Sequence, residues 1–256
     1  MRDIPNLLPS YEIEKNEGQY ILKYVAPPSY KGRAMLFMKG PLLENTCGNP
    51  EKIAEKIFYS KDKKPIIAPK QVHGVAILEP SPSMYLPYRP EGDGIVIDRV
   101  GIYGSLRFAD CFPVIIQGLR PKPWIAIAHS GFKGTLKNIA RTLIEKIIDK
   151  FNIQSAEDII GLIGPGICKN CYYREKDEPL TEEAMKLFPE EYWRVENDRV
   201  FFDIAGAIKK QLCDLGLSSQ AVKIIDLCSS CNNDLLYSYR RGEVEDRNFL
   251  LCFLGD

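Results

Sequence analysis

Histidine is scarce in this chain: only two occur among 256 residues, at His73 and His129. Net charge is absent as well, because 34 basic residues balance 34 acidic ones. This balance argues against a broad basic surface for duplex nucleic acid, so we expect no nucleic acid partner. A local basic pocket remains compatible with it.

Long apolar runs are also missing. No stretch approaches the roughly 18 residues that a membrane-spanning helix needs. The first residues lack the apolar segment of a secretory signal. We therefore expect a soluble cytoplasmic protein without a membrane partner. The length of 256 residues suggests one large domain or two small ones.

Cysteine, by contrast, is plentiful, with eight residues. Reduced thiols are the default in a chain without a secretory signal, with metal ligation or catalysis as the role of a minority. Cys213 falls in a helical pattern and Cys252 in an apolar strand, so both are interpreted as packing residues.

Short apolar runs bounded by turn residues predict many strands. They cover residues 34–38, 66–68, 75–78, 94–97, 113–116, 124–128, 159–163, 222–225 and 249–253. Helices are fewer, predicted at residues 51–59, 136–151 with Thr135 as the N-cap, 181–188, and from Asp203 to about Leu215. Strands and helices do not alternate regularly, which favours an α+β fold with mixed sheets and helices in one sandwich-like domain.

Three residues are candidates for chemistry. His73 lies at a turn that enters a strand, Cys111 at a loop that enters another, and His129 between a strand and a helix. Two imidazoles and a thiolate are the ligand set of a catalytic zinc with one open position. They are equally a possible nucleophile and base for a metal-free cysteine hydrolase. Spacing does not decide between these hypotheses.

Other segments offer candidate anion or metal sites. The turn at residues 131–135 brings backbone N–H groups and Lys133 to a helix start. Arg240 and Arg241 follow aromatic residues and suit an anionic or planar ligand. Two C-x-x-C pairs, at residues 168–171 and 228–231, are interpreted first as packing or chance, then as a structural metal site, and last as a redox site. The second interpretation would make the chain a zinc-stabilised binding protein.

In combination these segments resemble the YfiH family, the laccase-like multicopper polyphenol oxidase family. The similarity is carried by an ordered set of motifs: residues 71–74, 91–96, 109–114, 129–135 and 164–172, Asp203, residues 228–241, and Arg247. Each motif alone is weak, whereas the ordered set is specific. It covers roughly residues 34–254, and it implies a single catalytic domain over residues 1–256 with its core in that range.

The resemblance implies purine nucleoside chemistry: phosphorolysis of adenosine, inosine and methylthioadenosine, and deamination of adenosine. It implies one catalytic Zn²⁺ held by His73, Cys111 and His129. Asp110 or Asp93 then becomes a candidate for proton transfer, and Gln71, Lys133, Arg240 and Arg241 become candidates for binding substrate or phosphate. A monomer or a homodimer is expected.

Two departures bear on this expectation. The family turn H-A-G-W-R-G-T has phenylalanine and lysine here, at Phe132 and Lys133. Lysine keeps the charge of arginine but loses its bidentate geometry towards phosphate. The family's oxidase label implies several copper centres, which two histidines do not supply, so copper is not expected.

Overall fold

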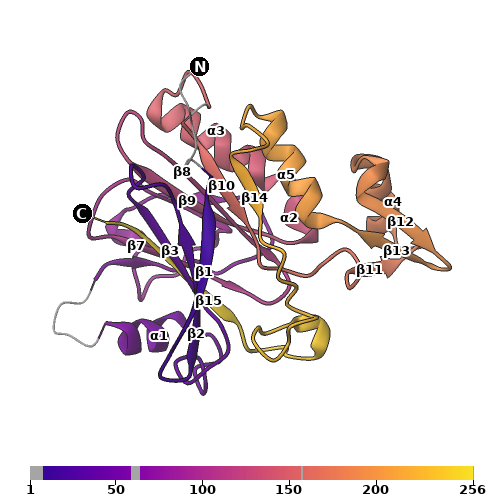
Figure 1. Ribbon diagram of the computed structural model, residues 1–256, viewed down its shortest axis with the longest axis horizontal. Helices are drawn as coiled ribbons and strands as arrows, with labels where there is room; N and C mark the ends of the chain where they lie inside the picture. The colour runs from indigo at the N-terminus through magenta and orange to yellow at the C-terminus, as the bar shows by residue number, and fades with distance from the viewer. Residues whose placement is uncertain (1–7, 59–63, 157, 256) are drawn as a thin grey trace.

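The computed structural model describes residues 8–58, 64–156 and 158–255. Two six-stranded sheets stack on each other, and helices cover the outer face of the second sheet (Figure 1). This arrangement confirms the predicted α+β sandwich. No helix within the described ranges is long and apolar enough to cross a membrane.

The first sheet contains the strands nearest both ends of the chain. Its order is β1 (Ser10–Asn16), β2 (Gln19–Val25), β3 (Gly32–Phe37), β15 (Asn248–Leu254), β7 (Tyr103–Phe108) and β4 (Ile66–Ile67). Only β4 pairs in parallel. The ordered sheet thus begins at Ser10, upstream of residue 34.

The second sheet supports the candidate chemistry. Its order is β14 (Val222–Ile224), β10 (Ile160–Ile163), β8 (Phe112–Gly118), β9 (Trp124–Ser130), β6 (Gly94–Ile97) and β5 (Ile77–Leu78). β8 and β9 form an antiparallel pair in which Pro113 lies opposite His129. β10 and β14 run in parallel, as do β5 and β6.

Both faces of the second sheet are buried, which explains the continuous apolar runs. On β8, Ile115 packs between the sheets, whereas Val114 and Ile116 face the helices. Side chains alternate between the faces of a strand, so a strand covered on both sides needs apolar residues throughout. Sequences of this kind are recognised most easily as strands.

The helices complete the layers. α3 (Ile139–Phe151) and α5 (Ile204–Asp214) pack on the second sheet, next to the short α2 (Phe132–Leu136). α1 (Pro50–Ile57) covers the other face of the first sheet through Ile53. A smaller sheet, β11 (Tyr173–Glu175), β13 (Arg199–Phe202) and β12 (Trp193–Glu196), lies with α4 (Pro179–Leu187) at one side (Figure 1). The short 3-10 helices are η1 (Pro82–Met84), η2 (Glu190–Tyr192) and η3 (Tyr239–Arg241).

Every predicted strand is present, but the prediction missed β1, β2, β7 and β11–β13. The expected N-cap at Thr135 is wrong. Thr135 is buried and donates its hydroxyl to the Gly131 carbonyl within α2. The following helix begins at Ile139, capped by Asn138, whose side chain accepts from the Arg141 N–H. The expected helix at residues 51–59 ends at Ile57, and residue 59 lies outside the described residues.

Candidate functional site

His73, Cys111 and His129 converge at one end of the two stacked sheets. His73 lies in the loop before β5, Cys111 in the turn between β7 and β8, and His129 near the end of β9. The nearest ligand atoms of the three side chains all lie within 4.8 Å of one another. The two imidazole ring centroids are 4.8 Å apart, at an angle of 68°. The exposure increases from buried His129 through half-buried Cys111 to exposed His73.

The carboxylate of Asp93 contacts both the loop that carries His73 and the imidazole of His129. It is fully buried, and its carboxylate accepts the backbone N–H groups of Val72, His73 and Gly74 at 3.1, 3.0 and 2.8 Å. The same carboxylate lies 2.9 Å from Nδ1 of His129. A carboxylate accepts at Nδ1, so the proton resides there and Nε2 keeps its lone pair for a ligand. Asp93 therefore fixes one loop and one tautomer together.

Two residues at the site have a left-handed backbone conformation, which is uncommon outside glycine. His73 has φ +57° and Asp110 has φ +79°. Left-handed conformations in non-glycine residues are uncommon and cluster at functional sites. Gly131 is required by close approach, because a Cβ there would lie 2.3 Å from Sγ of Cys111.

The pKa values of Cys111, His129 and Asp93 are all shifted by burial and by neighbouring groups. Burial alone would raise the pKa of Cys111, but His129 and His73 outweigh it and lower the pKa to about 6. Burial would lower the pKa of His129, whereas Cys111 and Asp93 raise it to about 9. Burial opposes ionisation of Asp93, yet hydrogen bonds from His129 and the backbone keep its pKa below the usual value. Each group thus favours the charged form of its neighbour.

Asp110 is engaged by the C-terminal loop. One of its oxygens accepts the hydroxyls of Ser229 and Ser238, each at 2.7 Å. The other accepts the backbone N–H of Arg240 at 2.7 Å, and the Asp110 carbonyl accepts the N–H of Ile167. The sequence singled out Asp110 for proton transfer, and the structure places its carboxylate in a binding role towards this loop.

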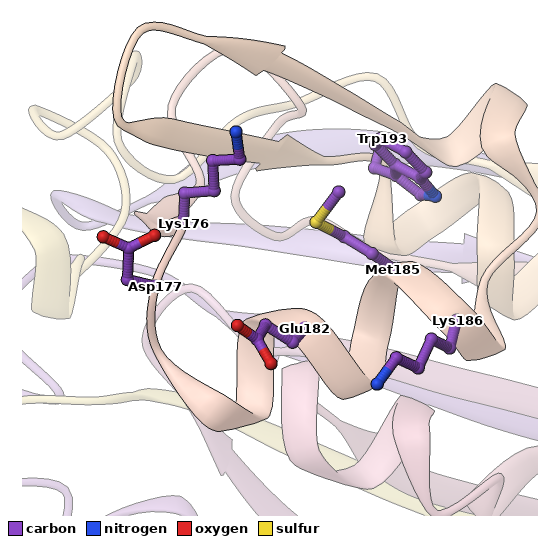
Figure 2. A pocket seen from close by; sticks show the side chains of 6 residues that line it. All are labelled: Lys176, Asp177, Glu182, Met185, Lys186 and Trp193. Atoms are coloured by element: carbon purple, nitrogen blue, oxygen red, sulfur yellow. The ribbon is translucent and has the colours of Figure 1, made fainter.

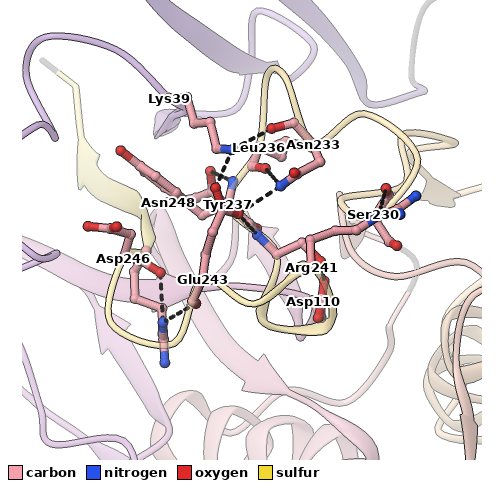
Figure 3. A network of polar contacts seen from close by, with 12 residues as sticks. Lys39, Asp110, Ser230, Asn233, Leu236, Tyr237, Arg241, Glu243, Asp246 and Asn248 are labelled. Carbon is pink, nitrogen blue, oxygen red and sulfur yellow. Dashed lines mark hydrogen bonds and ion pairs between the residues drawn. The ribbon is translucent and has the colours of Figure 1, made fainter.

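A second set of contacts holds the same loop against the first sheet (Figure 3). Glu243 accepts from the N–H of Ser238 and from the side chain of Asn233, each at 2.7 Å, and forms an ion pair with Lys39. The buried amide of Asn248 bonds to the backbone of Tyr237 and of Phe108. The position of Arg240 is thereby determined by residues distant in sequence.

The predicted substrate-binding residues fall in different places. Arg240 lies over the rings of Tyr172 and Tyr173, with centroids 5.5 and 4.5 Å away, and donates to the Tyr173 carbonyl. Burial raises the pKa of Tyr172, and the charges of Arg174, Cys111 and Arg240 contribute less to the shift. Arg240 is joined to the trio through its backbone N–H, which donates to Asp110, the residue before Cys111. Sequence reasoning missed Arg174, since an isolated arginine carries no pattern.

Lys133, Arg241 and Gln71 contribute differently. Lys133 is exposed on α2, and Arg241 turns to the Ser230 carbonyl at 2.9 Å (Figure 3). The Gln71 amide exchanges two hydrogen bonds of 2.8 Å with the backbone of Arg107. Gln71 therefore attaches the loop that carries His73 to β7.

A cluster of arginines accompanies this attachment. Burial and the charges of Arg89 and Arg247 together lower the pKa of Arg107 to about 10. Each of the three guanidinium groups also donates to backbone carbonyls. Of the three arginines, only Arg247 belongs to the motifs seen in the sequence.

The hollow shown in Figure 2 is separate from the trio. It lies between α4 and the small sheet and is lined by Lys176, Asp177, Glu182, Met185, Lys186 and Trp193. None of these side chains is a histidine or a cysteine. The hollow therefore offers no candidate for the chemistry expected at His73, Cys111 and His129.

Comparisons with known proteins agree with this description. A family model described as multi-copper polyphenol oxidoreductase laccase matches residues 28–250. The Bacillus subtilis protein named purine nucleoside phosphorylase YlmD is 28% identical over 167 residues, which are 64% of this chain and 58% of that protein. The match thus spans little more than half the length of that relative.

Solved structures share the fold over nearly the whole chain. The hypothetical protein YfiH from Bacillus licheniformis gives a TM-score of 0.80 at 18% identity, covering 95% of this chain and 99% of that one. YlmD from Geobacillus stearothermophilus gives 0.78 at 23% identity, covering 98% and 99%. At such identities the agreement establishes the fold alone.

Proposed function

The chain belongs to the multi-copper polyphenol oxidoreductase laccase family, and from that premise we propose that it is a zinc-dependent purine nucleoside phosphorylase. The name of its Bacillus subtilis relative supports this reaction. The observation that carries the proposal is the convergence of His73, Cys111 and His129, with the buried Asp93 bonded to His129 and with Arg240 bonded to Asp110, the residue before Cys111.

The donor set fits zinc. Two imidazoles and a thiolate are borderline-soft ligands, and three protein ligands leave one position for a substrate or water. The Asp93–His129 hydrogen bond is the outer-shell contact that zinc-binding histidines usually have. When bound, zinc would supply Lewis acidity.

The chain has too few histidines, in contrast, to bind the copper centres of an oxidase. Both histidines of the chain are used in this one trio. Several copper centres would need many more imidazoles. We therefore do not extend the oxidase activity in the family's name to this chain.

Phosphorolysis needs an anion site and a place for the purine. A phosphate oxygen attacks C1′ of the ribose, and the bond from C1′ to the base breaks with its electron pair on the base nitrogen, which then takes a proton. We assign Arg240 to the phosphate, with Lys133 as a further cation and the Arg89, Arg107 and Arg247 cluster as the alternative anion site. The ring of Tyr172 offers a surface for the base.

The remaining groups act by positioning. Asp93 holds the His73 loop and orients His129, Gln71 attaches that loop to β7, and Asp110 fixes the backbone of Arg240. Adenosine, inosine and methylthioadenosine are the proposed substrates. Deamination of adenosine by the same centre belongs to the proposal: water adds to C6 of the adenine ring, and the amino group takes a proton from that water and leaves as ammonia. A cytoplasmic protein, monomeric or homodimeric, is part of it as well.

A second candidate follows from Cys111. Its pKa of about 6 would make it a thiolate at neutral pH, and His129 and His73 lie beside it. A metal-free cysteine hydrolase would use this thiolate as nucleophile. The two candidates differ in their response to metal removal.

The test is incubation of zinc-loaded protein with adenosine or inosine, with and without phosphate, followed by chromatography of the products. The proposal expects free base and ribose 1-phosphate only when phosphate is present, and inosine from adenosine without it. A chelator and Cys111→Ser should each abolish turnover, whereas Cys213→Ser on α5 should retain it. Activity that survives the chelator but not alkylation of Cys111 would favour the hydrolase, and absence of any turnover would overturn the proposal.

A further inference from the structure

The two C-x-x-C pairs take no part in the proposed reaction, yet they meet in space. β10 and β14 are parallel neighbours, and their pairing continues past the strands through a bridge between Gly166 and Cys228. Both segments leave the sheet at the same edge, so the turns that follow lie side by side. The two cysteine pairs therefore meet although 56 residues (172–227) separate them in sequence.

The four sulfur atoms form a compact group. The Sγ atoms of Cys168, Cys171, Cys228 and Cys231 all lie within 4.8 Å of one another, and those of Cys171 and Cys231 are 3.4 Å apart. A tetrahedral zinc with Zn–S bonds of about 2.3 Å separates its sulfurs by about 3.8 Å. The Cys171–Cys231 separation of 3.4 Å is slightly shorter than this value and no separation exceeds 4.8 Å, so small side-chain movements would complete the tetrahedron.

The backbone around the group is arranged for thiolates. The N–H groups of Cys168 and Cys231 both point to Sγ of Cys228, at 3.2 and 3.4 Å. Hydrogen bonds to a charged form favour it. The two turns also share one hydrogen bond: Tyr172 N–H donates to the Cys168 carbonyl at 3.0 Å, and Asn232 N–H donates to the Cys228 carbonyl at 2.9 Å. Cys228 is buried and Cys231 is exposed, which gives an ion access from solvent.

We propose that these four cysteines bind one structural zinc ion, distinct from the site at His73, Cys111 and His129. Four protein thiolates fill the coordination shell, which is typical of a structural rather than a catalytic zinc. In zinc sites built from two C-x-x-C turns, a short spacer normally brings the two turns together. Here the parallel pairing of β10 and β14 brings them together instead.

This second ion would stabilise the segments around Asp110. Ile167, which precedes Cys168, donates to the Asp110 carbonyl, and Ser229, which follows Cys228, donates to the Asp110 carboxylate. The cluster therefore joins the two segments that contact Asp110. Its loss should loosen the placement of Arg240 while leaving His73, Cys111 and His129 in contact.

The experiment measures the number of zinc ions per chain in purified protein by inductively coupled plasma mass spectrometry. We expect about two zinc ions per chain in the wild type and about one in either Cys228→Ser or Cys111→Ser. The matched control Cys213→Ser should keep two. About one ion in the wild type, lost with Cys111→Ser and retained with Cys228→Ser, would overturn the inference without touching the proposed function.

X-ray absorption of the zinc-loaded wild type gives the same answer without a variant. Two sites with one and four sulfurs average about 2.5 sulfur ligands per zinc, whereas the trio alone gives about one. Peptide mapping without reductant is the third measurement. A disulfide between Cys171 and Cys231 in freshly purified protein would refute the metal site, and four thiols that alkylate only after chelation would support it.

Discussion

Replacing Asp93 with asparagine should weaken both the fold and zinc binding, because this one buried carboxylate connects them. Each of its oxygens accepts two hydrogen bonds, one from His73 N–H and His129 Nδ1, the other from the N–H groups of Val72 and Gly74. An amide has one acceptor oxygen and an NH₂ group that only donates. One pair of donors must therefore lose its acceptor.

The magnitude follows from that count. A half-buried donor without an acceptor costs about 1–2 kcal/mol, so two of them cost about 2–4 kcal/mol. If the NH₂ group turns towards His129, the proton of the imidazole moves to Nε2 and removes the lone pair that a metal needs. Loss of such an outer-shell partner typically lowers metal affinity by about 10–100-fold.

Two measurements separate these effects. Urea unfolding with a chelator present reports the free energy of unfolding without metal. Zinc titration against a competing chelator reports affinity. Asp98→Asn is the matched control, because Asp98 is also buried and lies beyond the other end of β6, paired with Lys122 and Lys150 at 3.2 and 3.4 Å. The control should leave zinc affinity unchanged. Equal zinc affinities of Asp93→Asn and the wild type would refute the role assigned to Asp93.

Three further predictions follow from the same site. Gly131→Ala should lower zinc affinity by at least about tenfold, because the new Cβ would lie 2.3 Å from Sγ of Cys111. The control Gly134→Ala, whose Cβ meets nothing closer than 3.4 Å, should retain the zinc affinity of the wild type. Equal zinc titrations of the two variants would count against the packing argument. In zinc-free protein, the rate of alkylation of Cys111 by iodoacetamide should be half-maximal near pH 6, the pKa of its thiol. An ordinary cysteine reaches half its maximal rate at about pH 8.5. A rate profile centred above about pH 8 would contradict this prediction. Arg240→Ala should raise the KM for phosphate about tenfold or more with little change in the KM for inosine. Arg141→Ala serves as the control, because the Arg141 side chain is exposed on α3. An unchanged KM for phosphate would remove Arg240 from the phosphate site.

The elements most visible in the sequence are those buried on both faces. β6, β8, β9 and β10 read as continuous apolar runs because sheet and helices cover them on both sides. β1 escaped detection because it is an edge strand of mostly polar and charged residues, with Tyr11 and Ile13 as its only apolar ones. β7 escaped detection because glycine, serine and arginine interrupt it. Such strands depend on partners that a local pattern does not contain.

The start of the helix after His129 was misplaced for a similar reason. Thr135 has the composition of an N-cap, but its hydroxyl is used inside α2 by the Gly131 carbonyl. Asn138, in a left-handed conformation, caps the next helix instead. Capping is decided by which backbone N–H groups are left free, and that depends on where the preceding turn packs.

Composition and motif order limited the residues that can carry chemistry: with two histidines in the chain, any site with two imidazoles must use His73 and His129, and the ordered motifs indicated the family. How these residues act together depends on the folded arrangement. It brought Cys111 between the histidines, placed Asp93 beneath them, turned Asp110 towards the C-terminal loop and joined two distant cysteine pairs. Residue types limit the chemistry that is possible, but distances between side chains on different strands depend on sheet pairing, which no local stretch of sequence contains.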